Sequence, residues 1–138
     1  MKQIFVVLLF ISTFGNAEES NFAIGLGVPY GTIGMQLSAN ISESSKGILG
    51  VGYGAYSVGY LAAFDDSEHQ SHAWGVSVYR KTVFADISAV TYHYQYRPNG
   101  FNETGLVYGV DFLAGRIERN GNSIEKDAFL FFNVGYQF

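Results

Sequence analysis

Four ionisable side chains lie within stretches that otherwise alternate between apolar and small residues. They are Asp86, His93, Asp111 and Arg116. A charge inside such a stretch is costly unless a partner of opposite charge or a hydrogen bond satisfies it. We therefore expect most of the four to meet inside the fold, with an ion pair between Arg116 and either Asp86 or Asp111. Such a cluster is either a polar plug that stiffens the fold or a path for protons or ions. Arg116 also fits the end of a strand.

A polar stretch between residues 65 and 72 holds the other candidate ligands. Its imidazoles and carboxylates belong to His69, His72, Asp65, Asp66 and Glu68. These side-chain types bind zinc, but their spacing matches no ordered motif. The glycine-rich run at residues 50–54 has period two and no helix after it, so it is not a phosphate-binding loop. We expect a solvated loop, no metal and no cofactor.

Composition excludes several classes of function. The chain has no cysteine, which rules out disulfides and thiolate metal sites. It has 8 basic and 12 acidic residues, and the excess of acid disfavours nucleic acid as a partner. Charged residues make up 14%, against about 25% in ordinary soluble proteins, and aromatic residues reach 17%. Without a helix-period segment after the amino-terminal run, this composition predicts an all-β fold.

The amino terminus has the pattern of a secretory signal peptide. Lys2 precedes an apolar run from Ile4 to Phe14, and Gly15-Asn16-Ala17 offers small residues for cleavage. The run is shorter than the roughly 20 residues of a spanning helix. We predict Sec-dependent export, removal of residues 1–17, and a single domain at 18–138.

Eight alternating segments follow, separated by turn signals. They cover residues 21–28, 32–41, 49–55, 56–64, 74–79, 83–96, 104–116 and 125–138. In the sixth, apolar residues move from odd to even positions, which predicts a β-bulge near Ala89-Val90. One face of each segment is apolar, and the other carries mainly Gly, Ser, Gln, Asn and Ala, with most charges in the turns. A water-facing surface would carry more charge, so the apolar face is expected to meet lipid.

The last strand gives the most specific pattern. Apolar or aromatic residues recur at every second position of it, namely Leu130, Phe132, Val134, Tyr136 and Phe138. With the signal peptide and the eight segments, this ending resembles small bacterial outer-membrane β-barrels of the OmpA/OmpX class. The resemblance implies an eight-stranded antiparallel up-and-down transmembrane β-barrel and a terminal signal, at these five residues, for the barrel-assembly machinery. It also implies lipid and lipopolysaccharide around the barrel, and both termini on the periplasmic side.

The pattern departs from that class in its connections. With a periplasmic amino terminus the odd-numbered connections are extracellular, yet those near Tyr30, Gly54 and Lys81 are very short. Either the strand count is off by one, or this is a minimal barrel without large surface loops, and the second case argues against adhesion or receptor roles. Several aromatic residues near strand ends are expected at the membrane–water boundary. They are Tyr30, Tyr56, Trp74, Tyr94, Tyr96 and Phe138.

His93-Tyr94-Gln95 resembles one strand of the outer-membrane lipid A deacylases, in which a nucleophilic serine follows the histidine by two residues. Gln95 stands where that serine is needed, and Ser88 is too far along the strand to replace it. We therefore predict a monomeric, non-enzymatic outer-membrane barrel with a structural or interaction role. A narrow channel for ions or small solutes, and a soluble periplasmic barrel that binds an apolar ligand, are the alternatives.

Overall fold

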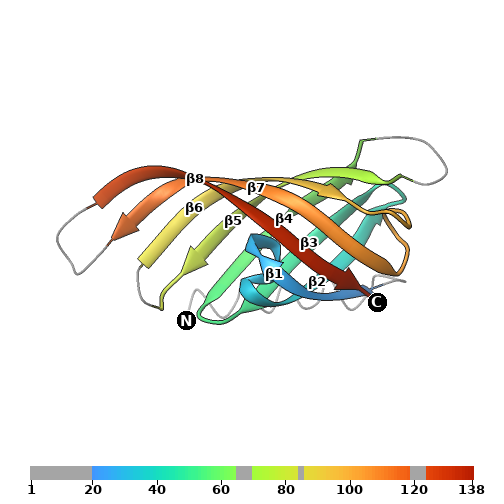
Figure 1. Cartoon of the computed structure of the whole chain (residues 1–138), viewed down its shortest axis with the longest axis horizontal. Coiled ribbons are helices and arrows are strands. Elements are labelled where there is room, and N and C mark those ends of the chain that lie inside the picture. Colours follow the sequence, from blue (N-terminus) through green and yellow to red (C-terminus); the bar gives the residue numbers. More distant parts are fainter. Residues whose placement is uncertain (1–19, 65–69, 84–85, 119–123) are drawn as a thin grey trace.

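The computed structural model describes residues 20–64, 70–83, 86–118 and 124–138, so the predicted signal peptide lies outside it. The described chain forms eight antiparallel strands that close into a barrel in chain order (Figure 1). The strands are β1 (Ser20–Gly27), β2 (Thr32–Ser42), β3 (Ser45–Gly52), β4 (Ala55–Ala63), β5 (His72–Lys81), β6 (Asp86–Tyr96), β7 (Gly105–Glu118) and β8 (Ile124–Gln137). A short 3-10 helix, η1 (Val28–Tyr30), joins β1 to β2. The predicted all-β, eight-stranded, up-and-down architecture is confirmed.

The two ends of the barrel differ in their connections. β1 begins and β8 ends at one end, which we call the terminal end, where the Phe138 N–H donates to the Phe22 carbonyl at 2.8 Å. The β2–β3, β4–β5 and β6–β7 connections lie there too. The opposite, distal end holds η1 and the β3–β4, β5–β6 and β7–β8 connections. Of these, the β1–β2 and β3–β4 connections are short, as the sequence predicts for those near Tyr30 and Gly54.

The strands run steeply across the barrel. Following paired residues once around it from Tyr136 returns to β8 at Lys126, a shift of ten residues. The path runs through Ile24, Met35, Val51, Tyr56, Arg80, Ser88 and Arg116. A shift of ten over eight strands corresponds to a tilt of roughly 40°. A barrel of this size has an interior that side chains can fill.

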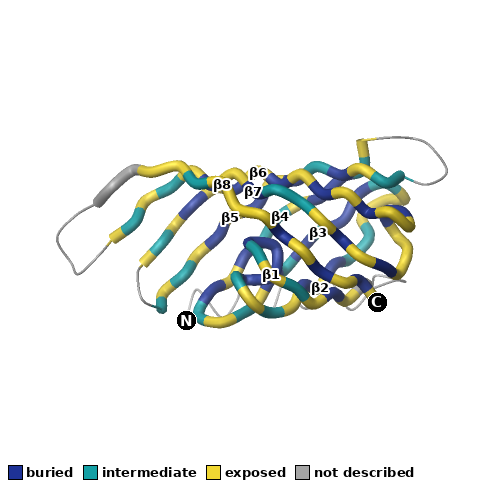
Figure 2. The backbone as a smooth tube through the Cα atoms, in the orientation of Figure 1, coloured by how far each residue is buried: buried dark blue, intermediate teal, exposed yellow. Residues whose placement is uncertain are grey.

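Exposure alternates along the strands (Figure 2). Small and polar residues such as Gln36, Ser77 and Thr91 point into the lumen and are buried, whereas Ile33 (61% exposed) and Val78 (60%) point outward. On β8 the outward residues from Ala128 to Phe138 are apolar or aromatic, which covers about 25 Å along the barrel axis at this tilt. The apolar surface of the described barrel is therefore its outside.

Two local predictions are wrong. β6 pairs with both neighbours without a shift at Ala89-Val90, whereas β2 has a register shift between Asn40 and Ser42. Ile87 and Ala89 need no bulge because they face an apolar layer of the lumen that includes Leu113. β3 also begins earlier than predicted, at Ser45, which brings Lys46 into the strand with its side chain buried.

The wall of the barrel is taller on one side. β7 and β8 have 14 residues each, whereas β1 and β3 have 8. In Figure 1, β5 to β8 project at the left beyond the blue and teal strands β1 to β3. At the low side, the chain leaves β1 at Gly27 (φ 117°) and turns inward as η1.

Candidate functional site

Four polar side chains meet in the middle of the lumen. Asp111 of β7 lies 2.7 Å from Nδ1 of His93, its partner residue on β6, and the His93 Nε2 lies 2.6 Å from the Ser77 hydroxyl of β5. Asn133 of β8 donates to the same Asp111 oxygen at 2.7 Å. We call Ser77, His93, Asp111 and Asn133 the Asp111 cluster. Because an ionised carboxylate only accepts hydrogen bonds, Nδ1 donates to Asp111, while the hydrogen bond between Nε2 and the Ser77 hydroxyl can run in either direction.

The Asp111 cluster also holds η1 inside the barrel. The Val28 N–H donates to the second carboxylate oxygen of Asp111 at 3.2 Å, so the carboxylate accepts three hydrogen bonds. Val28, Pro29 and Tyr30 are all buried, and η1 is coloured accordingly in Figure 2. Three donors and the buried turn make Asp111 the point at which the distal connection is fixed to the wall.

Tyr30 follows η1 into the lumen and not to the membrane boundary, which corrects the sequence prediction. Its side chain is fully buried against the backbone of β1 and β8, where a Cβ at Gly135 would lie 2.2 Å from its hydroxyl oxygen and a Cβ at Gly25 would lie 2.8 Å from its ring. Burial raises the pKa of Tyr30 to about 12, so the phenol is neutral at physiological pH. The glycines of these two strands therefore make room for a ring that folds in from the β1–β2 connection.

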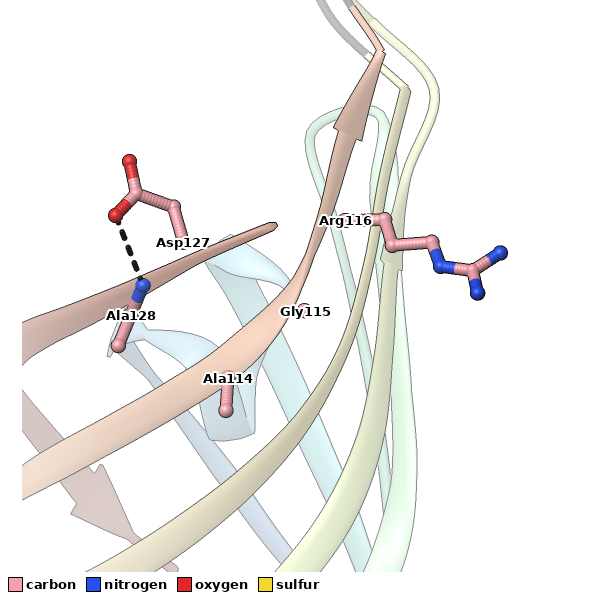
Figure 3. A pocket seen from close by; sticks show the side chains of 5 residues that line it. All are labelled: Ala114, Gly115, Arg116, Asp127 and Ala128. Carbon is pink, nitrogen blue, oxygen red and sulfur yellow. Dashed lines mark hydrogen bonds between the residues drawn. The ribbon is translucent and has the colours of Figure 1, made fainter. Parts of the chain in front are cut away.

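The four predicted lumen residues divide into two pairs. His93 and Asp111 are fully buried and in contact, with 2.7 Å between the His93 Nδ1 and a carboxylate oxygen. Asp86 and Arg116 are exposed, and in Figure 3 the Arg116 guanidinium points away from β8 and its Asp127. They occupy even positions, which face outward on β6 and β7. The predicted lumen ion pair with Arg116 is therefore absent.

Ser77 and Asn133 belong to the site although sequence reasoning passed over them. Gln95 of β6 has no hydroxyl, but Ser77 on the neighbouring strand β5 brings one to His93. Ser77 reaches it because it pairs with Thr91, which lies two residues before His93 on β6. The alternation of side chains along β5 predicts that Ser77 faces the lumen. Its position beside His93, however, depends on the register between β5 and β6. Gln95 instead binds Arg97, with its Oε1 2.8 Å from a guanidinium nitrogen.

The order Ser77–His93–Asp111 is that of a nucleophile, a base and an orienting carboxylate. Burial limits what this arrangement does chemically. His93 and Asp111 have no exposed surface and Ser77 has 4%. None of the three lines either of the described cavities. A substrate carbonyl therefore has no approach to the serine oxygen, and the chain of hydrogen bonds acts as a cross-strand tie between β5, β6, β7 and β8.

A second group of buried side chains, the terminal plug, closes the lumen at the terminal end. It consists of Lys46, Gln95, Arg97, Phe101 and Gln137. Lys46 Nζ donates to the Phe101 carbonyl at 2.9 Å, and Arg97 donates to the same oxygen at 3.1 Å. Both cations also lie against the Phe101 ring, at 4.7 and 5.2 Å from its centroid.

Neutral amides hold Arg97 within the terminal plug. Its guanidinium donates to the side-chain oxygens of Gln95 and Gln137. Burial lowers the pKa of Arg97 to about 10, which leaves it protonated at neutral pH. The plug therefore places positive charge in the terminal end of the lumen.

Two hollows of the described barrel differ in kind. A depression of about 600 Å³ on β7 and β8 is bordered by Ala114, Arg116 and Asp127 (Figure 3). Asp127 and Arg116 point away from one another there, and Asp127 accepts from the neighbouring Ala128 N–H at 3.1 Å. A smaller cavity of about 320 Å³ at the distal end is lined mainly by apolar side chains from η1 and β5 to β8. The second hollow is the better candidate for a binding site.

Four of the five predicted assembly residues lie on the outer face of β8, and the fifth, Phe138, directly follows that strand. Their exposed fractions run from 39% to 80%, for Leu130, Phe132, Val134, Tyr136 and Phe138. Phe138 contacts Phe22 of β1 and Tyr136 of β8, with ring centroids 5.7 and 5.0 Å apart. Their recognition by an assembly machinery stays a prediction.

Residues 65–69 fall outside the described chain, so the predicted loop there, with its candidate ligands, is described only at its flanks. Elsewhere, within the described ranges, no group of three His, Cys, Asp or Glu is placed to hold a metal ion. No helix of the described chain is long and apolar enough to cross a membrane.

No protein-family model, curated protein or solved structure matches the chain.

Proposed function

We propose that this chain is an integral β-barrel of the bacterial outer membrane with a structural or interaction role and no enzymatic activity. The observation that carries the proposal is the inverted distribution of polarity. Outward side chains such as Phe132 (80% exposed) are large and apolar, while Gln36, Ser57, Thr91 and the Asp111 cluster fill the inside. Lipid is the solvent that such a surface fits.

Two bands on the outer face support a membrane position. Near the terminal end, aromatic rings contact one another from strand to strand, for example Tyr60 with Trp74 and Phe64 with Tyr94. Towards the distal end the apolar surface gives way to a charged rim, formed by the exposed residues Arg80, Asp86, Arg116 and Glu118. Aromatic residues favour the membrane boundary, and cations at the rim suit acidic lipid headgroups such as those of lipopolysaccharide.

The packed lumen argues against the channel alternative. η1 and Tyr30 fill it from the distal side, and the terminal plug fills it from the other side with fully buried Lys46 and Phe101. An ion would have to displace both groups to pass. The soluble alternative conflicts with the exposed apolar side chains on the outside of the barrel, since a large apolar surface on a water-soluble protein promotes association.

A charge placed on the outer face tests the proposal. Val76 lies in the middle of the apolar band, whereas Ser88 lies beside Arg80 and Arg116 in the pairing of β5, β6 and β7. In phosphatidylcholine vesicles, Val76→Arg should lower the free energy of unfolding by about 2–4 kcal/mol, and the control Ser88→Arg by about 0–1 kcal/mol. Equilibrium unfolding in urea, followed by the fluorescence of the single tryptophan, Trp74, measures both.

The same experiment separates the alternatives. A soluble barrel would stay folded without lipid or detergent, and V76R would increase its solubility. Wild-type protein that folds in buffer alone, or V76R that is as stable in vesicles as the wild type, would refute the membrane proposal. Ion conductance across planar bilayers above the empty-membrane background would favour the channel instead.

A further inference from the structure

The barrel wall is incomplete on one side of β8. β1 pairs with β8 only between Ala23–Leu26 and Val134–Gln137. β8 continues for ten residues beyond that ladder, from Asn133 back to Ile124, and pairs there with β7 alone. Because β1 ends at Gly27 and the chain turns inward, no described strand covers this edge. Phe131 is 47% exposed although its position in β8 faces the lumen.

The cavity of about 320 Å³ lies at this gap. It is lined by Phe131 from the lumen side of β8 and by Phe132 from the outer side of the same strand. One cavity reaches both faces of a strand only where the wall is open. The hollow therefore connects the distal part of the lumen sideways with the apolar outer surface.

The lining selects an apolar occupant. Its inner surface is made by Val28, Tyr79, Ile87, Leu113 and Phe129. Val28 and Leu113 are about 95% buried and close the floor towards the Asp111 cluster. The Tyr79 hydroxyl is already hydrogen-bonded to Thr32 at 2.7 Å, so an apolar ligand would not leave it without a hydrogen-bond partner. The volume is at the lower end of the roughly 300–1,000 Å³ of ligand pockets, which suits one chain and not a bulky ring system.

One cation borders this apolar space. Among the described residues that line the cavity, only Lys81, the last residue of β5, is charged, and it lies at the distal mouth beside the charged rim. An ammonium at the mouth of an apolar slot complements an amphiphile with an acidic head and an apolar tail.

We propose that this cavity binds one acyl chain of an acidic membrane lipid, which enters sideways between β8 and η1 and keeps its phosphate near Lys81. The inference rests on the membrane location proposed above. A second copy of the chain that pairs with the open edge of β8 is the competing occupant. It would cover the edge but leave the concave apolar floor unfilled.

Photolabelling from the bilayer tests the site. The mature chain is reconstituted into vesicles of phosphatidylethanolamine and phosphatidylglycerol that contain a phosphatidylglycerol probe with a diazirine at the end of one acyl chain. After irradiation, peptide mass spectrometry should find label on the lumen-side residues Leu113, Phe129 and Phe131 as well as on the outward Leu130. Label on lumen-side residues requires that the chain end has passed the wall.

Two variants with matched controls sharpen the result. Leu113→Trp fills the floor and should lower labelling of Phe129 by about tenfold, the loss expected when about two methylene groups lose their site. Val90→Trp adds the same ring to the outer face and should change nothing. Lys81→Gln should lower the preference for the acidic probe over a phosphatidylcholine probe by about threefold, whereas Arg80→Gln, which removes a rim cation outside the cavity, should lower it less. Heat-modifiable gel mobility checks that each variant is folded, and Leu113→Phe replaces L113W if that variant is not.

The possible outcomes separate the two proposals. Folded protein that floats with the vesicles but carries label only on outward residues would overturn the acyl-chain site and leave the membrane proposal standing. Cross-linked dimers through β8 without lumen-side label would assign the edge to a second copy, which also overturns the site. Protein that does not float with vesicles would overturn the proposed membrane location and this inference with it.

Discussion

The two ends of the lumen are closed by opposite means. At the terminal end, side chains converge on one aromatic ring, since Lys46 and Arg97 both donate to the Phe101 carbonyl and lie against its face. At the distal end a backbone turn does the closing, with η1 held to the carboxylate of Asp111. One closure places positive charge in the lumen, and the other is built on a negative group.

The difference extends to the packing around each closure. Phe101 belongs to a fully buried apolar cluster with Ile48, Leu61 and Ala73. The distal apolar layer, by contrast, borders an open cavity and a strand edge without a described partner. The close packing around Phe101 at the terminal end stabilises the fold, whereas the space beside the distal layer leaves room for a ligand. We therefore expect the terminal end to contribute more to the stability of the barrel.

The largest effect is expected from Phe101→Ala. Removing the ring leaves a cavity in the buried cluster and takes the aromatic face away from two cations, so the free energy of unfolding should fall by about 3–5 kcal/mol. Urea unfolding in detergent micelles, followed by Trp74 fluorescence, measures the loss. Phe132→Ala, at an 80% exposed position, is the control and should cost far less. If both variants lowered the free energy of unfolding equally, the terminal plug would not be more important for stability than the outer surface.

A smaller effect is expected where a glycine gives space to the distal closure. A Cβ at Gly135 would lie 2.2 Å from the Tyr30 hydroxyl oxygen, whereas a Cβ at Gly47 would meet only the end of Ile41 at 3.8 Å. Gly135→Ala should therefore displace the Tyr30 ring and cost about 1–3 kcal/mol. Gly47→Ala should stay within about 0.5 kcal/mol of the wild type. Accessibility of Tyr30 to nitration should rise in G135A alone, and an unchanged Tyr30 would contradict the proposed role of this glycine.

The barrel itself could be predicted because its signal is local. Side chains of a strand alternate between two faces, so period two appears in the sequence before any pairing is known. The same parity places position 116 on the face of Leu106 and Phe112, which is the outer one. The alternation of β7 therefore argues against a lumen position for Arg116, and the prediction of a buried ion pair at this residue is wrong.

The site was harder to predict because it depends on register and on one irregular turn. Ser77, His93 and Asp111 come from three strands, and a shift of one residue between any two would separate them. The inward path of Val28-Pro29-Tyr30 follows from a three-residue helix after Gly27, where turn signals predict a reversal but not its direction. Sequence reasoning therefore found two members of the Asp111 cluster and missed the turn that the cluster holds.

The smallest effect distinguishes a structural tie from a catalytic group. Ser77→Ala removes the hydroxyl from His93 Nε2 and should cost about 1 kcal/mol in unfolding free energy, the usual contribution of one hydrogen bond, with the barrel otherwise unchanged. Ser88→Ala, at an exposed position on β6, should change the free energy by less than about 0.5 kcal/mol. If the serine were a nucleophile, a fluorophosphonate probe would label the wild type in vesicles and S77A would lose that label. Because Ser77 is 96% enclosed and borders neither described cavity, we expect no label on either protein, and specific labelling at Ser77 would show that the lumen opens to substrates.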